Sequence, residues 1–245
     1  KSLCTQNLPD PTIADGSTAM DVALWTANGS NQTITGFNFS PDLVWAKSRS
    51  TGTTPHLLVD TVRGASQSLS SHSTGAEEDY SGISGVISSF NSDGFDTGGN
   101  SDIATNNRTF VGWSWDAGTS TVSNTDGTIT SNVRANPSAG FSICTYTGST
   151  GNQSFGHGLN AAPKFIVIKN RSTAANWFAM VDIGTTYLKY GHLNATDAFG
   201  DATAQSVSSS TVTLGNNNAW FGANGDNYVA YCFAPVAGYS AFGTY

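Results

Sequence analysis

The chain contains the same stretch of sequence twice. The first copy reads Pro41-Asp-Leu-Val-Trp-Ala-Lys47-Ser-Arg49-Ser-Thr51, and the second reads Pro163-Lys-Phe-Ile-Val-Ile-Lys169-Asn-Arg171-Ser-Thr173. Downstream, Thr109-Phe-Val-Gly-Trp-Ser-Trp115 matches Asn227-Tyr-Val-Ala-Tyr-Cys-Phe233 at a similar separation. A repeat of about 120 residues is the size of a whole domain, whereas solenoid units have periods of about 20 to 50 residues. The sequence therefore predicts a duplicated domain.

The repeat divides the chain into five segments. We expect an extended connector at 1–20, a first repeat at 21–117, an ordered linker with a small hairpin at 118–139, and a second repeat at 140–237. Residues 238–245 are similar to the opening of the second repeat, so we expect a third repeat to start there. A closing strand of similar sequence is the alternative. We interpret the chain as a piece of a longer, multidomain protein.

Strand signals dominate the sequence. Residues 43–46 and 165–168 are continuous apolar runs, which are typical of strands buried on both faces. Residues 110–115 and 228–233 alternate large and small side chains, and Asn-Gly or Asp-Gly turns recur between such runs. We therefore predict an all-β fold of two tandem homologous antiparallel β-sandwiches, jelly-roll-like or lectin-like.

The charge content excludes some function classes. Only 11% of residues are charged and the net charge is −7, so the chain lacks the basic face with which proteins neutralise nucleic-acid phosphates. No apolar run approaches the roughly 18 residues of a membrane helix. We expect neither nucleic-acid binding nor membrane insertion. A surface rich in hydroxyl and amide groups suits an extracellular β-protein.

Catalytic signals are weak. Glu77 and Glu78 are adjacent, so in a strand they would point in opposite directions, and we interpret them as a solvated charge cluster. We expect no catalytic residues and no enzymatic activity, although an Asp pair assembled through space stays open. The oxygen-bearing stretch from Asn91 to Asp96 favours an Asp-Gly turn over a calcium site, so no metal or cofactor is expected.

The cysteines indicate no disulfide framework. Cys4, Cys144 and Cys232 form no CxxC pair, and their number is odd. We interpret them as free thiols, and buried ones in the case of the two that lie in alternating runs.

Two basic pairs recur in both copies. Lys47 with Arg49, and Lys169 with Arg171, follow the apolar runs, and alternation places each pair on one face of a strand. Structural ion pairs or hydrogen-bonded strand ends are one interpretation. A polar anchor for a sugar or an acidic glycan is the other.

The tryptophans separate into two groups. Trp25, Trp45, Trp113 and Trp115 have aromatic or apolar counterparts in the second copy, so we assign them to a core or a domain interface. Trp177 and Trp220 lie in or beside Asn-rich segments. With Asn217 and Asn218, they are the candidates for stacking against a sugar ring.

Several stretches resemble a known family. The resemblance lies in six stretches: Asn7-Leu-Pro-Asp-Pro-Thr-Ile-Ala-Asp-Gly16, Trp25-Thr-Ala-Asn-Gly-Ser30, Pro41-Asp-Leu-Val-Trp-Ala-Lys47, Val59-Asp-Thr-Val-Arg-Gly64, Ser89-Phe-Asn-Ser-Asp-Gly-Phe95 and Tyr228-Val-Ala-Tyr-Cys-Phe-Ala-Pro-Val-Ala-Gly-Tyr-Ser240. They resemble a repeat domain of large fibre-like virion proteins of marine tailed bacteriophages, which often follows a SPRY-like domain. The resemblance implies a lectin-like β-sandwich with a role in virion structure or host-surface adhesion. It supplies no catalytic residues.

These observations predict a structural and host-adhesion module of a phage tail fibre or virion-surface appendage, made in the host cytoplasm and displayed on the virion. We expect weak, multivalent binding of host surface glycans. The expected protein partners are further copies of the chain, most simply in a trimeric fibre, and other virion proteins. The alternatives are a structural spacer or capsid decoration without a ligand, and a polysaccharide depolymerase.

Overall fold

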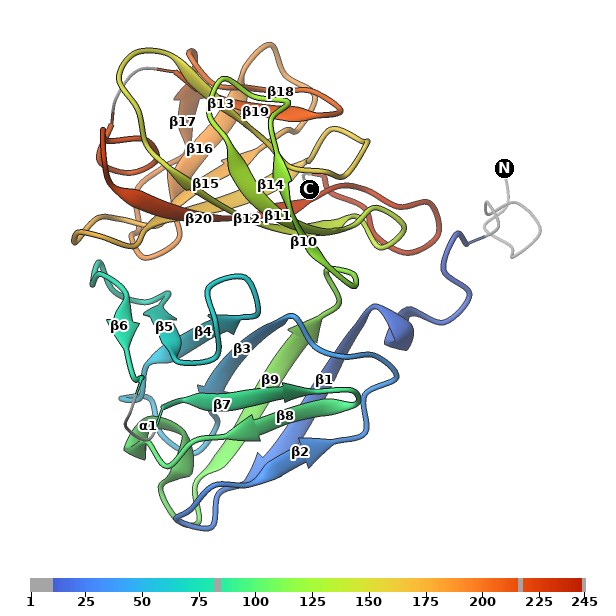
Figure 1. Ribbon diagram of the computed structural model, residues 1–245, viewed down its shortest axis with the longest axis vertical. Helices are drawn as coiled ribbons and strands as arrows, with labels where there is room; N and C mark the ends of the chain where they lie inside the picture. The colour runs from blue at the N-terminus through green and yellow to red at the C-terminus, as the bar shows by residue number, and fades with distance from the viewer. Residues whose placement is uncertain (1–10, 82–84, 216–217, 244–245) are drawn as a thin grey trace.

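The structure is a computed structural model that describes residues 11–81, 85–215 and 218–243 (Figure 1). It is all-β, with antiparallel pairing between neighbouring strands of its sheets. Within these ranges the helical turns are Gly16–Thr18 and α1 (Ser101–Ala104). The described residues contain no helix with the length and apolarity needed to span a membrane.

The first half of the chain builds one large and one small sheet. The large sheet has the order β1-β9-β3-β4-β5-β6, with β1 (Met20–Thr26), β9 (Thr109–Trp115), β3 (Leu43–Ser48), β4 (His56–Asp60), β5 (Gln67–Ser70) and β6 (Glu78–Asp79). The small sheet has the order β2-β8-β7, with β2 (Thr33–Thr35), β8 (Gly94–Thr97) and β7 (Ile87–Asn91). A core that includes Trp25, Val44 and Phe95 lies between the two.

The second half has the same strand order with two strands added. Its large sheet is β10-β11-β12-β20-β14-β15-β16-β17, with β10 (Thr121–Asn124), β11 (Ser131–Asn136), β12 (Phe141–Thr147), β20 (Asn227–Phe233), β14 (Phe165–Asn170), β15 (Phe178–Val181), β16 (Leu188–His192) and β17 (Gly200–Ala202). Its small sheet is β13-β19-β18, with β13 (Gln153–Gly156), β19 (Thr211–Gly215) and β18 (Ser206–Val207). Tyr146, Phe155 and Ile168 lie in the core between them.

A third core joins the two halves. Leu43, Leu58 and Leu69 of the six-stranded sheet pack against residues of the eight-stranded sheet that include Val167 and Tyr231. The apolar runs in β3 and β14 follow from this arrangement, because each strand faces its own small sheet on one side and the opposite large sheet on the other. The two large sheets thus form the middle layers of the molecule.

The segment 118–139, expected to be a linker, is part of the eight-stranded sheet. β10 and β11 form a hairpin, and β11 then pairs with β12 from Ser131↔Tyr146 to Asn136↔Phe141. The second arm starts at Ser131 rather than at Ile129. The turn requires glycine, since a Cβ on Gly127 would lie 2.2 Å from the carbonyl oxygen of Ser154.

The N-terminal end of the described chain lies beside residues 237–239. The amide of Thr12 donates to the carbonyl of Ala237 at 3.0 Å, and Gly16 packs on the ring of Tyr239. Residues 238–245 were expected to open a third repeat; the described part, 238–243, contributes only the isolated bridge Val236↔Ser240, and 244–245 lie outside the described residues. Residues 1–10 of the expected connector lie outside the described residues.

Candidate functional site

An aromatic cleft opens where the facing surfaces of the two large sheets diverge. Phe141, Phe233 and Phe165 are direct neighbours across β12, β20 and β14, with ring centroids 4.9 and 5.7 Å apart. Trp115 of β9 packs on the first two of these rings from the opposite sheet, at 6.1 and 6.2 Å. We call the hollow between Trp45, Trp115, Phe165, Phe233 and Phe242 the aromatic cleft; its volume is about 240 Å³.

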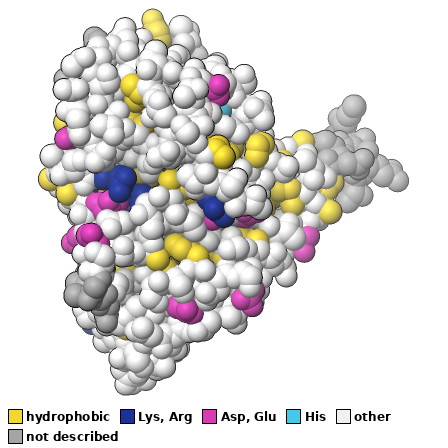
Figure 2. Space-filling model, viewed as in Figure 1, with side chains coloured by type: hydrophobic (Ala, Val, Ile, Leu, Met, Phe, Trp, Pro, Cys, Tyr) yellow, Lys and Arg dark blue, Asp and Glu magenta, His cyan; other side chains and the backbone are white. Residues whose placement is uncertain are grey.

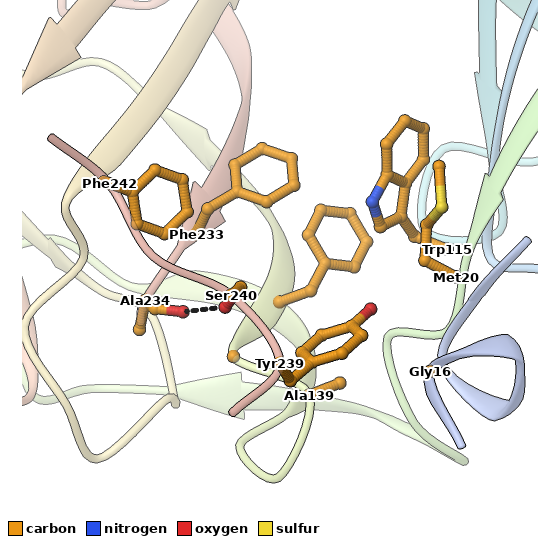
Figure 3. Close-up of a pocket in the computed structure, with 11 residues that line it drawn as sticks. Gly16, Met20, Trp115, Ala139, Phe233, Ala234, Tyr239, Ser240 and Phe242 are labelled. Atoms are coloured by element: carbon orange, nitrogen blue, oxygen red, sulfur yellow. Dashed lines mark hydrogen bonds between the residues drawn. The ribbon is translucent and has the colours of Figure 1, made fainter. Parts of the chain in front are cut away.

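The C-terminal segment lines a second hollow that adjoins the aromatic cleft. This hollow measures about 400 Å³ and lies between Met20, Trp115, Phe233 and Tyr239. Figure 3 shows Phe233 and Phe242 on one side of it and Trp115 with Met20 on the other, with Tyr239 below. The hydroxyl of Ser240 donates to the carbonyl of Ala234 at 3.4 Å, which helps to hold the segment in place.

The cleft continues onto an open sheet face that carries three indole rings. Trp45 and Trp113 are a direct cross-strand pair with centroids 6.4 Å apart and ring planes at 68°. With Trp115 and His56 they border a depression of about 350 Å³, which we call the tryptophan hollow. We expected these tryptophans to be core or interface residues, and Trp45 and Trp115 do pack against the core between the halves. All three nevertheless stay half-buried, because the two large sheets overlap over only part of their faces.

Polar groups are few at the tryptophan hollow. Burial lowers the pKa of His56, and the nearby Lys47 and His72 lower it further, so its ring is neutral at pH 7. The ammonium group of Lys47, opposite His56 on β3, donates to the carbonyls of Thr51 at 3.3 Å and Thr54 at 2.8 Å. A neutral imidazole beside three indoles can accept or donate one hydrogen bond to a ligand stacked on the rings.

A buried ion network connects the two halves. Arg63, whose side chain is fully buried, contacts Asp60 at 2.5 Å and Glu77 at 2.8 Å. Glu77 also binds Arg171 of the other half at 2.7 Å, and the hydroxyl of Tyr231 donates to Asp60 at 2.8 Å. Burial alone would lower the pKa of Arg63, but the surrounding Asp60, Tyr231 and Glu77 raise it. The expected solvated charge cluster is therefore wrong for Glu77, which is paired with two arginines.

The four basic candidates have different surroundings. Lys169 is fully buried, and its ammonium donates to the carbonyls of Thr74 at 3.2 Å and Asn170 at 2.8 Å. Arg171 belongs to the ion network, and Lys47 is bound to its own loop. Arg49 is exposed. Three of the four thus make structural contacts, and only Lys47 lies beside the tryptophan hollow.

The expected sugar-stacking role of Trp177 is wrong. Its side chain is fully buried in the core between the two halves, and its indole N–H donates to the carbonyl of Ser70 at 3.0 Å. Trp220 is half-buried against His192 and Phe178, at centroid distances of 4.6 and 6.3 Å.

Of the two asparagines proposed to bind a sugar with Trp220, only Asn218 is described, and it makes a local backbone contact. The side-chain oxygen of Asn218 accepts from the backbone amide of Trp220 at 2.8 Å, in a tight turn. Asn217 lies outside the described residues.

The described residues contain no cluster of three or more His, Cys, Asp or Glu side chains with metal-binding geometry. The carboxylate of Asp96, in the stretch weighed as a calcium site, accepts from Ser89 at 2.6 Å and from Asn91 at 3.1 Å. Cys144 and Cys232 are free and buried, and Cys4 lies outside the described residues.

Sequence patterns gave no indication of two features, the contact between Arg63 and Tyr231 and the position of His56 at the tryptophan hollow. Arg63 and Tyr231 are far apart in the chain and have no local spacing that would connect them. His56 gave no metal-ligand spacing, and its position beside the tryptophans depends on the pairing of β3 with β4. A charged residue three positions after the end of the buried strand β4 was the one available signal for Arg63.

Comparisons with known proteins give one result. No curated protein and no solved structure matches the chain. A family model described as a domain of unknown function, DUF7483, matches residues 15–245, which include both large sheets. Because the match covers nearly the whole chain, the chain belongs to this family, the DUF7483 domain of unknown function.

Proposed function

We propose that the chain is a non-enzymatic structural and adhesion module of a virion appendage, such as a phage tail fibre, and that its two halves are copies of one duplicated β-sandwich. The repeated strand order and the matching registers support the duplication: Trp45 opposes Trp113 as Val167 opposes Tyr231. The resemblance of the sequence to fibre-like virion proteins supports the location on the virion surface. The carboxylate of Glu77 forms ion pairs with Arg63 and Arg171, which supports a structural rather than a catalytic role.

The tryptophan hollow carries the adhesion proposal. Three half-buried indoles border an open depression of about 350 Å³, with the neutral His56 at its edge. The C–H face of a pyranose ring packs well on an aromatic plane, and a sugar hydroxyl can exchange a hydrogen bond with an imidazole. The proposed ligand is a glycan of the host surface.

The low charge of the surface supports a place in a larger assembly. Figure 2 shows few charged side chains on the face drawn, most of it formed by uncharged polar groups and backbone. Such a surface can pack against neighbouring virion proteins, or further copies of this chain, without desolvating many ions. Several weak sites on one appendage raise the overall affinity through effective concentration.

The adhesion proposal is tested with Trp113→Ala on a glycan array and on host cells. Trp113 lies in the hollow and is only half-buried, so the variant is expected to fold and to lose glycan binding. Trp220→Ala removes the other half-buried candidate indole, and loss of binding in this variant but not in Trp113→Ala would place the site beside Trp220 instead. Equal binding by Trp113→Ala and the wild type would refute the assignment of the hollow.

A structural spacer without a ligand is the second candidate, and the buried ion network favours it. Arg63, Glu77 and Arg171 tie the two halves together and suit a rigid building block. A wild-type chain that binds no array glycan and no host cell, while still assembling, would support the spacer. Release of reducing sugars from host polysaccharide would instead reveal a depolymerase and overturn both candidates.

A further inference from the structure

β1 differs from every other strand that ends a described sheet. It has seven residues, whereas β6 and β18 have two, β2 and β17 have three, β10 and β13 have four, and β7 has five. Long edge strands present a row of free backbone groups for pairing with another chain, and proteins usually keep their edges short. In Figure 1, β1 lies beyond β9 at the end of the six-stranded sheet.

In the second half of the chain, another strand pairs with the edge that corresponds to the free edge of β1. β12 has the same place in its sheet as β1, next to the strand that closes each half. The outer side of β12 pairs with β11 over six antiparallel residue pairs. Within the described part of the chain, no strand takes this place beside β1.

The backbone N–H and C=O groups on the outer edge of β1 are those of its even-numbered residues. The carbonyl of Ala19 and the amide of Ala27 bond to the β9 side, at 2.9 and 2.8 Å. Because backbone groups alternate along a strand, the N–H and C=O groups of Val22 and Leu24 point away from β9. The side chains of Val22 and Leu24 are 43% and 61% exposed, and both lie on the face that carries Trp113.

We propose that β1 pairs antiparallel with β1 of a second copy of this chain, with Val22 of each copy opposite Leu24 of the other. This register joins the outward backbone groups of both strands, because both residues are even-numbered. It also turns two exposed apolar side chains into two cross-strand apolar pairs. The contact is self-complementary, as a twofold dimer requires.

Two internal contacts compete with this pairing at the edge. The side-chain amide of Gln32 donates to the outward carbonyl of Thr26 at 3.2 Å. The carboxylate of Asp21 accepts from the amide of Val22 at 2.8 Å, which occupies one of the outward donors. Dimerisation must release this contact, so Asp21 limits the affinity. Since pairing along the edge leaves the sheet faces free, the tryptophan hollows of both copies remain open on one continuous sheet.

The pairing is tested by sedimentation of the 245-residue chain over about 1 to 500 µM. We expect a monomer–dimer equilibrium. Leu24→Lys should raise the dimer dissociation constant about tenfold or more, through charge repulsion across the twofold axis. Val122→Lys is the matched control, since Val122 is 55% exposed on β10, the edge strand of the other large sheet, and should leave the equilibrium unchanged.

Two further variants separate edge pairing from contact between faces. Leu24→Pro removes an outward amide while keeping the bonds to β9, so it should abolish the dimer. Asp21→Ala frees the amide of Val22 and should tighten the dimer, which keeps the test decisive if the proline variant fails to fold. A monomer at all concentrations, a trimer, equal effects of Leu24→Lys and Val122→Lys, or a weaker dimer with Asp21→Ala would each overturn the proposal.

Discussion

The guanidinium group of Arg63 donates a hydrogen bond to the phenol oxygen of Tyr231 at 3.1 Å, although the two residues are 168 positions apart in the chain. Tyr231 in turn donates to Asp60, and Arg63 reaches Glu77. A fully buried arginine of the first half is therefore neutralised and oriented partly by groups that the second half holds in place. The relative position of the two large sheets depends on this polar contact as well as on the apolar core around it.

Replacement of Arg63 by alanine should strongly destabilise the fold. It leaves the carboxylate of Asp60 buried without its ion-pair partner and leaves Glu77 paired with Arg171 alone, and breaking a buried ion pair from one side costs about 3–5 kcal/mol. Tyr231→Phe removes the hydroxyl that accepts from Arg63 and donates to Asp60, so two hydrogen bonds are lost, and it should cost about 1–3 kcal/mol. Urea denaturation measures both changes in the free energy of unfolding.

The control for Arg63→Ala is Lys189→Ala. Lys189 pairs with Asp201 at a partly exposed site, where an ion pair contributes about 0–1 kcal/mol. Equal destabilisation by Arg63→Ala and Lys189→Ala would contradict the importance of the buried network.

Trp177→Ala should reduce stability rather than ligand binding. The side chain is fully buried between the halves, and truncation of a buried tryptophan costs about 3–5 kcal/mol. Trp177→Phe keeps most of the packing and loses the hydrogen bond to Ser70, which should cost about 1 kcal/mol. Thermal melting beside the half-buried Trp220→Ala measures the difference; a wild-type melting temperature for Trp177→Ala would refute its place in the core.

The sequence predicted the strands well because their signal is local. The apolar runs at 43–46 and 165–168 and the alternation at 110–115 and 228–233 fall within β3, β14, β9 and β20. The site was predicted poorly because its signal is not local. The asparagine next to Trp177 in the sequence suggested an exposed side chain, but the indole is buried in the core between the halves and donates to Ser70 of the other half. Alternation likewise placed Trp113 on one face without showing that the opposing sheet stops short of it.

Lys169 should make stability rise with pH above neutrality. Burial lowers the pKa of its ammonium to about 8 from 10.5, and its hydrogen-bond partners are carbonyls. Below pH 8 the folded state holds a buried charge; between pH 8 and 10.5 the folded lysine is neutral while the unfolded one still binds a proton. The unfolded state then binds more protons, so the free energy of unfolding increases with pH.

The gain from Lys169 should reach at most about 2 kcal/mol between pH 8 and 9.5, at 1.36 kcal/mol per pH unit. Lys169→Met removes the titrating group, so the difference between wild type and variant isolates this effect from other groups. Measurements stop at pH 9.5 because the buried Tyr231, whose pKa is raised by burial, would oppose the trend once tyrosines ionise in the unfolded chain. A difference that does not change between pH 7 and 9.5 would contradict the assignment.

The two halves should unfold together in a single transition, despite the repeated strand order. Leu43, Leu58 and Leu69 share one core with Val167 and Tyr231, and the ion network crosses the same boundary, so neither half keeps its buried surface without the other. Scanning calorimetry should give a calorimetric enthalpy equal to the van't Hoff enthalpy. Arg63→Ala weakens the shared boundary more than either small-sheet core, so the same measurement on this variant should show a broader transition, with a van't Hoff enthalpy below the calorimetric one. Two separate transitions in the wild type would show instead that the halves are independent domains and that the boundary between them contributes little.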